Sequence, residues 1–327
     1  MFRETKVLVA GGTGFIGANV VQRLLAAGSR VRSTVHRRPP RIFDPGIEYV
    51  QADLTTMDDC RRVVDGMDYV FMCAASTSGA AVMTSTPLVH VTSNVVMNAQ
   101  LMDAAYYAGV KKYLFISSSA AYPPTGSRPV AESEMFLGDP YDTYYSVGWM
   151  KRYVEVLCLM YAMRLTPPMA TVVIRPSNAY GPLDNYDLKT SHMTAALIRK
   201  VVERQAPLEV WGTGDDVRDL IYIDDLVEGI VKAFEGTASY SAVNIASGVA
   251  YSVKEVLQTI LRTDGYANAD VRFNASRPST IPVRLVDVAK ARSEFGFEAA
   301  HGLEDGIRET LAWYRRSVAG AKTSPAR

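Results

Sequence analysis

The first half of the chain alternates short apolar runs with longer amphipathic stretches. Runs rich in Val, Ile, Leu, Phe and Tyr predict strands at 6–10, 31–35, 47–54, 68–75, 111–119 and 170–176. Apolar residues with helical spacing predict helices at 15–28, 57–66, 88–108 and 146–164. Strands that are apolar throughout and alternate with helices are typical of a parallel sheet covered on both faces. The pattern therefore predicts a doubly wound α/β fold.

Beyond Pro176 the pattern changes. Proline and glycine become frequent, the helices shorten, and strand-like pieces such as 208–212 and 242–248 are interspersed. We expect a first domain at 1–175 and a smaller C-terminal lobe at 176–318, with some segments of the lobe returning to the first domain. Residues 319–327 are predicted to form a disordered tail.

Composition narrows the class of protein. The 327 residues carry a net charge of +1, with 48% hydrophobic and 21% charged residues, which gives no reason to expect a nucleic acid or a membrane surface as partner. The three cysteines (Cys60, Cys73 and Cys158) lack metal-site spacing, so we expect reduced thiols and no metal. The N-terminus has no apolar signal core, and no apolar run approaches the roughly 20 residues of a membrane span. We expect a cytoplasmic protein.

A glycine-rich turn joins the first predicted strand to the first predicted helix. In "VLVAGGTGFIG", Gly11 permits a tight turn, Gly14 lets the backbone approach a pyrophosphate, and Gly17 allows close packing of helix on strand. Phe15 and Ile16 open the helix, whose N-terminus faces the phosphate charge. This context predicts a dinucleotide cofactor and a Rossmann-type sheet.

The end of the second strand bears on which dinucleotide binds. An acidic residue there would bind the ribose hydroxyls, but the chain has Val35 and His36, followed by Arg37 and Arg38. Two arginines suit a 2′-phosphate, which favours NADP over NAD; the alternative is a solvated basic loop.

At the end of the third strand, Asp53 and Leu54 are candidates to border the adenine. Asp53 is equally a candidate to cap the helix that follows.

The chain as a whole resembles the extended short-chain dehydrogenase/reductase family. The segments that carry this resemblance run from residue 6 to about 315 in the family's order: "GGTGFIG" (11–17), "DL" (53–54), "CAAS" (73–76), "SNVVMNAQLMDAA" (93–105), "FISSSAAYP" (115–123), "RPSNAYGP" (175–182) and "RDLIYIDD" (218–225). Within the family, residues 180–200 and 210–219 are most similar to GDP-fucose synthase and GDP-mannose 3,5-epimerase.

The resemblance implies an enzyme with a nicotinamide cofactor on the sheet, Ala74 beside it, and a nucleotide sugar in the cleft between the lobes. It also implies a homodimer. It assigns Ser118 to catalysis, where it donates a hydrogen bond to the reacting sugar oxygen, and Ser119 to the substrate. Tyr122 is the anchor of that segment; capping is the alternative role for the serines.

Lys151 matches the family's lysine, which holds the nicotinamide ribose and lowers the pKa of a neighbouring tyrosine. An ordinary surface lysine is the alternative. The tyrosine position, four residues earlier, is Val147, which exchanges no proton.

Tyr145 is a shifted candidate, but Trp149 follows it four residues later, and two residues rotate a side chain by roughly 200° around a helix. Tyr144 or Tyr145 at a flexible helix start stays open as a substitute. An engineered replacement at position 147 is also open.

The resemblance also implies substrate-binding residues. His192 matches one of two groups that move protons in fucose synthase, whereas the cysteine of that pair is replaced by Ala120. Capping is the alternative for His192. Asn178 matches a residue near the sugar and diphosphate, and Arg218 matches an arginine that clamps the diphosphate. Weaker candidates are Lys200, Trp211, Arg277 and Arg284.

Together these features predict an NAD(P)-dependent epimerase that acts on a nucleotide sugar, most plausibly a GDP sugar, through a keto-sugar. The site is atypical because Val147 replaces the tyrosine. The alternatives are an NADPH-dependent 4-keto-sugar reductase and a redox-silent protein that binds a dinucleotide or sugar nucleotide.

Overall fold

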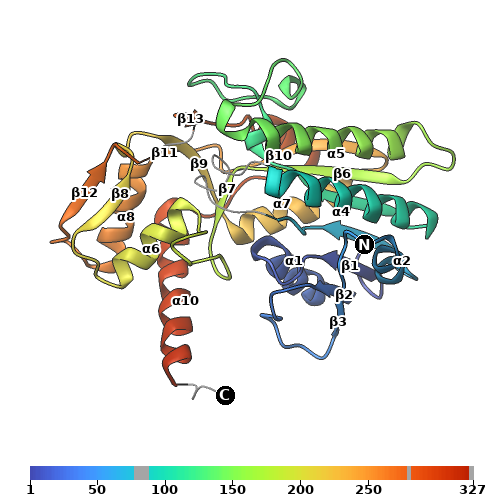
Figure 1. Cartoon of the computed structure of the whole chain (residues 1–327), viewed down its shortest axis with the longest axis horizontal. Coiled ribbons are helices and arrows are strands. Elements are labelled where there is room, and N and C mark those ends of the chain that lie inside the picture. Colours follow the sequence, from blue (N-terminus) through green and yellow to red (C-terminus); the bar gives the residue numbers. More distant parts are fainter. Residues whose placement is uncertain (77–87, 278–280, 324–327) are drawn as a thin grey trace.

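The computed structural model describes residues 1–76, 88–277 and 281–323 (Figure 1). Its centre is a seven-stranded sheet in the order β10-β6-β5-β4-β1-β2-β3, and every neighbouring pair is parallel. The strands are β1 (Lys6–Ala10), β2 (Arg30–Val35), β3 (Ile47–Gln51), β4 (Tyr69–Met72), β5 (Lys112–Ile116), β6 (Ala170–Pro176) and β10 (Tyr240–Ile245). The predicted doubly wound parallel sheet is confirmed.

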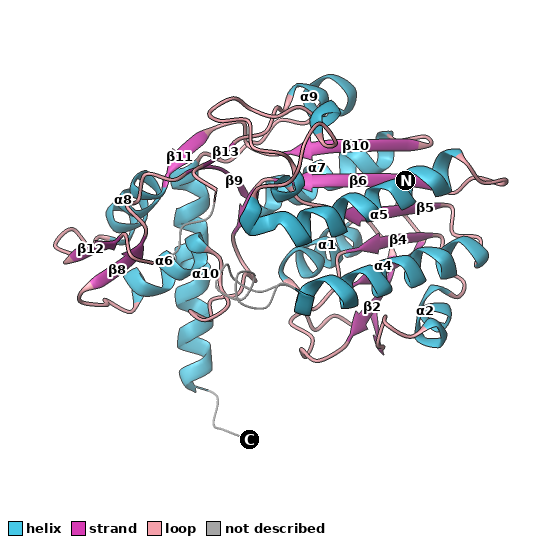
Figure 2. Ribbon diagram, turned by 45° about the horizontal axis from the view of Figure 1, so that its top comes forward, coloured by secondary structure: helices cyan, strands magenta, loops and turns pink. Residues whose placement is uncertain are grey.

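Helices cover both faces of this sheet because residues along each strand alternate between them. Val7 and Val9 of β1 join the core beneath two helices, α1 (Phe15–Ala26) and α7 (Ile223–Gly236). Leu8 belongs to the core on the other face. The helices there are α2 (Met57–Val64), α4 (Leu88–Tyr107) and α5 (Tyr145–Met163), and Figure 2 shows α4 and α5 side by side.

The remaining elements form the lobe that holds the left part of Figure 1. A four-stranded sheet and a separate parallel pair lie against its helices. Its strands are β7 (Asn178–Tyr180), β8 (Leu208–Trp211), β9 (Val217–Tyr222), β11 (Ala250–Ser252), β12 (Val271–Asn274) and β13 (Val283–Arg284). Its helices are α6 (Met193–Val202), α8 (Val253–Asp264) and α10 (Leu303–Thr323). The exception among these later elements is α9 (Ala289–Phe295), which packs against α7 and β10 of the main sheet (Figure 2).

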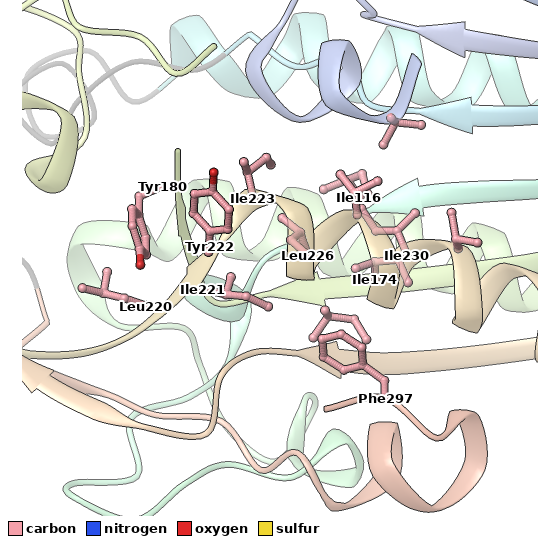
Figure 3. Close-up of a cluster of buried hydrophobic side chains, with 14 of the residues drawn as sticks. Ile116, Ile174, Tyr180, Leu220, Ile221, Tyr222, Ile223, Leu226, Ile230 and Phe297 are labelled. Carbon is pink, nitrogen blue, oxygen red and sulfur yellow. The ribbon is translucent and has the colours of Figure 1, made fainter. Parts of the chain in front are cut away.

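One apolar core joins the sheet to the lobe. Figure 3 shows Ile116 and Ile174 of the main sheet beside Ile230 of α7, with Leu226 and Tyr222 further along the same cluster. The strand β10 and the helix α7 lie in the layers of the main sheet although they come late in the sequence. The division of the chain at residue 175 therefore stays a prediction, since the two parts share a core.

Strand order explains where a ligand would bind. β1 lies in the middle, with β2 and β3 on one side and β4, β5, β6 and β10 on the other. The connections leave β1 and β4 in opposite directions, which opens a crevice at the carboxyl ends of these two strands.

Several ends differ from the sequence prediction. β5 stops at Ile116, before the three serines, because the chain turns into a 3-10 helix, η1 (Ser119–Ala121), where Ser118 caps the N-terminus. Two more 3-10 turns are η2 (Glu132–Glu134) and η3 (Asp142–Tyr144). α10 continues to Thr323, into the predicted tail, where Ala and Lys favour helix; residues 324–327 lie outside the described part.

Candidate active site

The glycine turn after β1 forms a narrow cradle at the crevice. Gly11 has a φ of +81°, and a Cβ there would lie 2.5 Å from the Cα of Ala74. A Cβ on Gly17 would lie 2.3 Å from the carbonyl oxygen of Gly11. Both positions therefore require glycine, for backbone conformation and for close packing.

The start of α1 completes this cradle. Gly14 is the N-cap and offers no side-chain cap to the first amides, and Phe15 and Ile16 form the first turn. Uncapped amides at a helix N-terminus bind an anion favourably. The residues present thus fit the pyrophosphate of a dinucleotide, and the contact between Gly11 and Ala74 places both predicted residues at the same site.

The loop after β2 carries an open pair of cations. Arg37 and Arg38 are exposed and make no hydrogen bond or ion pair with any described residue. This leaves both guanidinium groups available to a phosphate.

Asp53, in contrast, is held in the turn that precedes α2. Its carboxylate accepts hydrogen bonds from the backbone N–H and the hydroxyl of Thr55, at 3.0 and 2.7 Å. These bonds lower the pKa of Asp53. Leu54 is buried, and its carbonyl accepts a hydrogen bond from the Cys60 thiol. Asp53 thus shapes the turn before α2 but does not cap the helix, whose N-cap is Thr56. A contact of Asp53 with adenine stays a prediction.

A buried asparagine fixes the loop after β4. The side chain of Asn94 on α4 accepts a hydrogen bond from the N–H of Ser76 and donates one to its carbonyl, both at 2.9 Å. Asn94 lies within a segment that resembles the family, but its role was not predicted. Because the buried amide of Asn94 pairs with both the N–H and the C=O of Ser76, it fixes the backbone that follows Ala74.

Lys151 lies at the carboxyl end of β5. Its Nζ donates to the carbonyl of Ile116 at 2.7 Å and lies 4.7 Å from the centre of the Phe115 ring. Burial lowers the pKa of Lys151 to about 8, against the opposing effect of Glu155. The lysine is thus held beside the crevice, next to the segment that carries Ser118.

Ser118 presents its hydroxyl proton at the same strand end. Its Oγ accepts a hydrogen bond from the N–H of Ala120 at 3.1 Å. The acceptor side is therefore occupied, while the O–H remains able to donate to a substrate oxygen. Ser119, the next residue, is buried at the start of η1.

Beneath these residues lies a buried polar network that the sequence analysis missed, apart from Tyr122. Arg175 pairs with Glu155, with their side chains 4% and 1% exposed, at 2.6 Å. Arg175 also donates to the Tyr122 hydroxyl at 2.8 Å, and that hydroxyl donates to Asn244 at 2.7 Å. Burial raises the pKa of Tyr122, which makes it an anchor rather than a proton-exchanging group. Two signals were available: Arg175 lies in the family-like segment 175–182, and Glu155 follows Lys151 by four residues on the same helix.

Two arginines lie opposite this strand end. Arg218 and Arg284 are register partners on β9 and β13, with relative exposures of 8% and 6%. Arg284 donates to the carbonyls of Pro123 and Tyr122 at 3.0 and 3.1 Å, and its Nε is buried without a hydrogen-bond partner.

These two guanidinium groups also lie near each other and near one phenol. Burial lowers the pKa of Arg284 to about 10; the Tyr144 phenol raises it, and the charge of Arg218 lowers it further. Asp216 forms an ion pair with Arg218 at 3.5 Å, while the Nε of Arg284 has no partner among the described residues. Binding of a diphosphate at this pair stays a prediction.

Comparison with known proteins agrees with this geometry. The sequence profile of the NAD dependent epimerase/dehydratase family matches residues 7–246. The chain belongs to this family. It is 28% identical to a probable GDP-L-fucose synthase 1 of Oryza sativa subsp. japonica, over 97% of this chain and 94% of that protein. It is 26% identical to GDP-mannose 3,5-epimerase 1 of the same plant, over 98% and 84% respectively.

Among solved structures, MoeE5 in complex with UDP-glucuronic acid and NAD superimposes with a TM-score of 0.84 at 27% identity, covering 95% of this chain and 99% of that one. The resemblance to the epimerases and reductases of the extended short-chain dehydrogenase/reductase type is thereby confirmed, and with it the prediction of an enzyme.

Other predicted residues of this epimerase-family chain lie around the crevice or further out. Asn178 begins β7 and is exposed, and His192 is the exposed N-cap of α6. Lys200 donates to the carbonyl of Glu209 at 2.6 Å. Trp211 is 46% exposed, beneath the guanidinium of Arg277. Their roles stay predictions.

The start of α5 carries three aromatic residues, Tyr144, Tyr145 and Trp149, in different surroundings. Tyr145 is 51% exposed, and Trp149 donates from its indole to Asp139 at 3.2 Å on the outer side of the helix. Val147 lies one turn before Lys151. Tyr144 is the N-cap residue.

Across the described ranges, no helix is long and apolar enough to cross a membrane. The same residues contain no group of His, Cys, Asp and Glu that could hold a metal ion.

Proposed function

We propose that the chain is an NADP-dependent epimerase of a GDP-linked hexose that works through a keto-sugar. One observation carries this proposal: Ser118 and Lys151 both lie at the carboxyl end of β5, and the pair Arg218 and Arg284 is anchored to the same segment, at Tyr122 and Pro123. A hydroxyl donor and a cation near two arginines match a sugar and the diphosphate attached to it.

The cofactor would lie along the crevice. The cradle of Gly11, Gly14 and Gly17 would hold the pyrophosphate, and Arg37 and Arg38 the 2′-phosphate. Bound NADP supplies the oxidation and reduction of one sugar carbon. Lys151 would turn its ammonium from the Ile116 carbonyl to the ribose hydroxyls, and its positive charge would stabilise a nearby anion.

The sugar would lie between Ser118 and the arginines. Ser118 would donate to the oxygen of the reacting carbon, where negative charge develops as the keto form exchanges with the alcohol. Arg218 and Arg284 would bind the diphosphate, and Asn178 and His192 the sugar. The names of the related synthase and epimerase support GDP as the base.

A second candidate is a 4-keto-sugar reductase. Epimerisation beside a ketone needs groups that remove and return a proton, and Ala120 leaves His192 without the partner that the family resemblance would pair with it.

Val147, in turn, favours the redox-silent alternative.

We further infer a homodimer. The outward face of α5 exposes large apolar side chains in a row of helical spacing: Tyr145, Trp149, Tyr153, Val156, Leu159, Met160 and Met163. Together they form a continuous apolar face, and such faces mark protein–protein interfaces. α4 packs beside α5.

The test of the proposed function uses GDP-mannose and NADP. We expect NMR of the nucleotide sugar to show an epimer accumulating with no net change in cofactor. Net consumption of NADPH with a GDP-linked 4-keto-sugar, and no epimer, would favour the reductase instead. Binding of both ligands without either product would favour the redox-silent alternative.

A further inference from the structure

We propose that Tyr144 is the catalytic acid/base of this site, in place of a tyrosine at position 147. The proposal rests on the proposed function, since it assigns the group that exchanges a proton with the sugar oxygen. Three observations carry it: the face of α5 on which Tyr144 lies, its position beside two buried arginines, and its unpaired phenol.

Tyr144 shares a helix face with Lys151. The two are seven residues apart, and Val147 lies between them at three and four residues. Successive residues rotate by about 100° around a helix, so seven residues return to within about 20° of the starting direction. Tyr144 is thus in line with the lysine, about two turns closer to the helix N-terminus.

This N-terminal position brings the phenol to the substrate side of the crevice. Burial lowers the pKa of Arg218, and the Tyr144 phenol raises it. The same phenol also raises the pKa of Arg284. It thus acts on both guanidinium groups. Geometry agrees, since Pro123, whose carbonyl accepts a hydrogen bond from Arg284, lines one cavity together with Tyr141 and Asp142, the residues that lead into Tyr144. The guanidinium groups are fixed by hydrogen bonds to backbone carbonyls, including those of Val217 and Pro123.

The phenol itself is available. Tyr144 is partly buried, and its backbone N–H donates to Tyr141 at 2.7 Å, which fixes the η3 turn at the start of α5. Its hydroxyl makes no hydrogen bond to any described residue. A partly buried phenol with no hydrogen-bond partner among the described residues and two cations in the same region is placed to act as an acid or a base.

The other candidates in this region lack one of these properties. Tyr145 is 51% exposed and lies about 120° around the helix from the Lys151 face. Tyr122 is buried with both hydrogen-bonding directions of its hydroxyl used, by Arg175 and Asn244. Val147 has no exchangeable proton.

The step balances as follows. In the oxidising direction, the C–H bond of the sugar carbon breaks and its two electrons and hydrogen pass as hydride to oxidised nicotinamide, the oxidant. The O–H bond on the same carbon breaks, and its proton passes to the Tyr144 phenolate, which becomes a phenol. Reduction of the keto-sugar runs both transfers in reverse.

The test compares wild type, Tyr144→Phe, the matched control Tyr145→Phe, and the double variant Tyr144→Phe/Val147→Tyr. Single-turnover formation of reduced nicotinamide after mixing the NADP complex with GDP-mannose reports hydride transfer, across a range of pH. Calorimetry reports the Kd of GDP-mannose for each protein, independently of turnover.

We expect Tyr144→Phe to slow hydride transfer by about 10²–10⁴-fold and to remove one ionisation from the pH profile. Its Kd for GDP-mannose should stay within about threefold of wild type, which is less than the loss expected from a charge-assisted phosphate contact. Tyr145→Phe should behave as wild type, and the double variant should regain part of the lost rate.

An active wild type whose rate and pH profile survive Tyr144→Phe would overturn this assignment and leave the proposed function standing. A variant that loses affinity for GDP-mannose but keeps its bound-state rate would make Tyr144 a diphosphate ligand, which also overturns it. A wild type that binds GDP-mannose and shows no hydride transfer would overturn both proposals.

Discussion

Arg218 and Arg284 face each other across the β9–β13 pair, and both side chains are more than nine-tenths buried. Each is held by backbone carbonyls, and the positive charge of one lowers the pKa of the other. Two like charges lie together here, and the ion pair of Arg218 with Asp216 at 3.5 Å offsets part of the electrostatic cost. We propose that the diphosphate of the substrate offsets the rest.

Replacement of Arg218 by Ala should weaken binding of GDP and of GDP sugars alike. A charge-assisted hydrogen bond to phosphate is worth about 1.5–3 kcal/mol, so the Kd should rise roughly ten- to over a hundred-fold. Calorimetric titration measures it, and the affinity for NADP should not change. Arg272→Ala is the matched control, because Arg272 is an exposed arginine of β12 that pairs with Asp270. Equal losses in both variants would refute the assignment.

Replacement of Arg37 by Ala should weaken NADP binding by a similar factor and leave NAD binding unchanged, because only NADP carries the 2′-phosphate. Fluorescence titration of the reduced cofactors provides the two constants. Arg61, an exposed arginine paired with Asp58 on α2, is the control position. A wild type with equal affinity for both cofactors would contradict the expected preference.

His301 should make stability depend on pH. Burial lowers its pKa, but the hydrogen bond to Asp225 and the carboxylates of Asp225, Glu309 and Asp224 together raise it above 6.5. A group whose pKa is higher in the folded state stabilises the folded protein. This stabilisation is complete at pH values below the pKa of the unfolded state, and it disappears as the pH rises through the pKa of the folded state. The imidazole also packs on the ring of Tyr222, with 4.6 Å between the ring centres, and this packing does not depend on pH.

His301→Gln should therefore lower the melting temperature more at pH about 6 than at pH about 8.5. His36→Gln, at an imidazole that is 52% exposed, should show a much smaller difference. If His301→Gln lowers the melting temperature by the same amount at both pH values, the ring acts by packing alone.

A charge on the apolar face of α5 should dissociate the proposed homodimer. Leu159→Asp places a carboxylate in the centre of that face, at a residue 40% exposed in the single chain. Analytical ultracentrifugation should show a dimer for wild type and a monomer for the variant. Phe43→Asp, at an 88% exposed residue of another surface, should remain dimeric. A wild type that is already monomeric contradicts the inference.

Much of the fold could be predicted because its signals are local. The six strands before residue 177 were identified within a few residues, since buried parallel strands are apolar throughout. The strand ends were less well predicted: β5 ends at Ile116 because Ser118 forms a cap with Ala120, and a serine run alone does not show where the ladder stops.

The site was only partly predictable, because it depends on contacts between distant segments. The contact of Gly11 with Ala74 followed from the glycine pattern and the family resemblance. The pairing of Arg218 with Arg284 did not, since it arises from the register of β9 with a two-residue strand far along the chain. Nor did the position of Tyr144, since the sequence alone did not show that α5 begins directly after it.

The most direct test of the whole account is the absorbance of reduced nicotinamide when the wild-type NADP complex is mixed with GDP-mannose. The account predicts that the absorbance rises in the first turnover, as the sugar is oxidised, and falls as the epimer forms. A GDP-mannose complex, verified by calorimetry, whose nicotinamide absorbance never changes would contradict it.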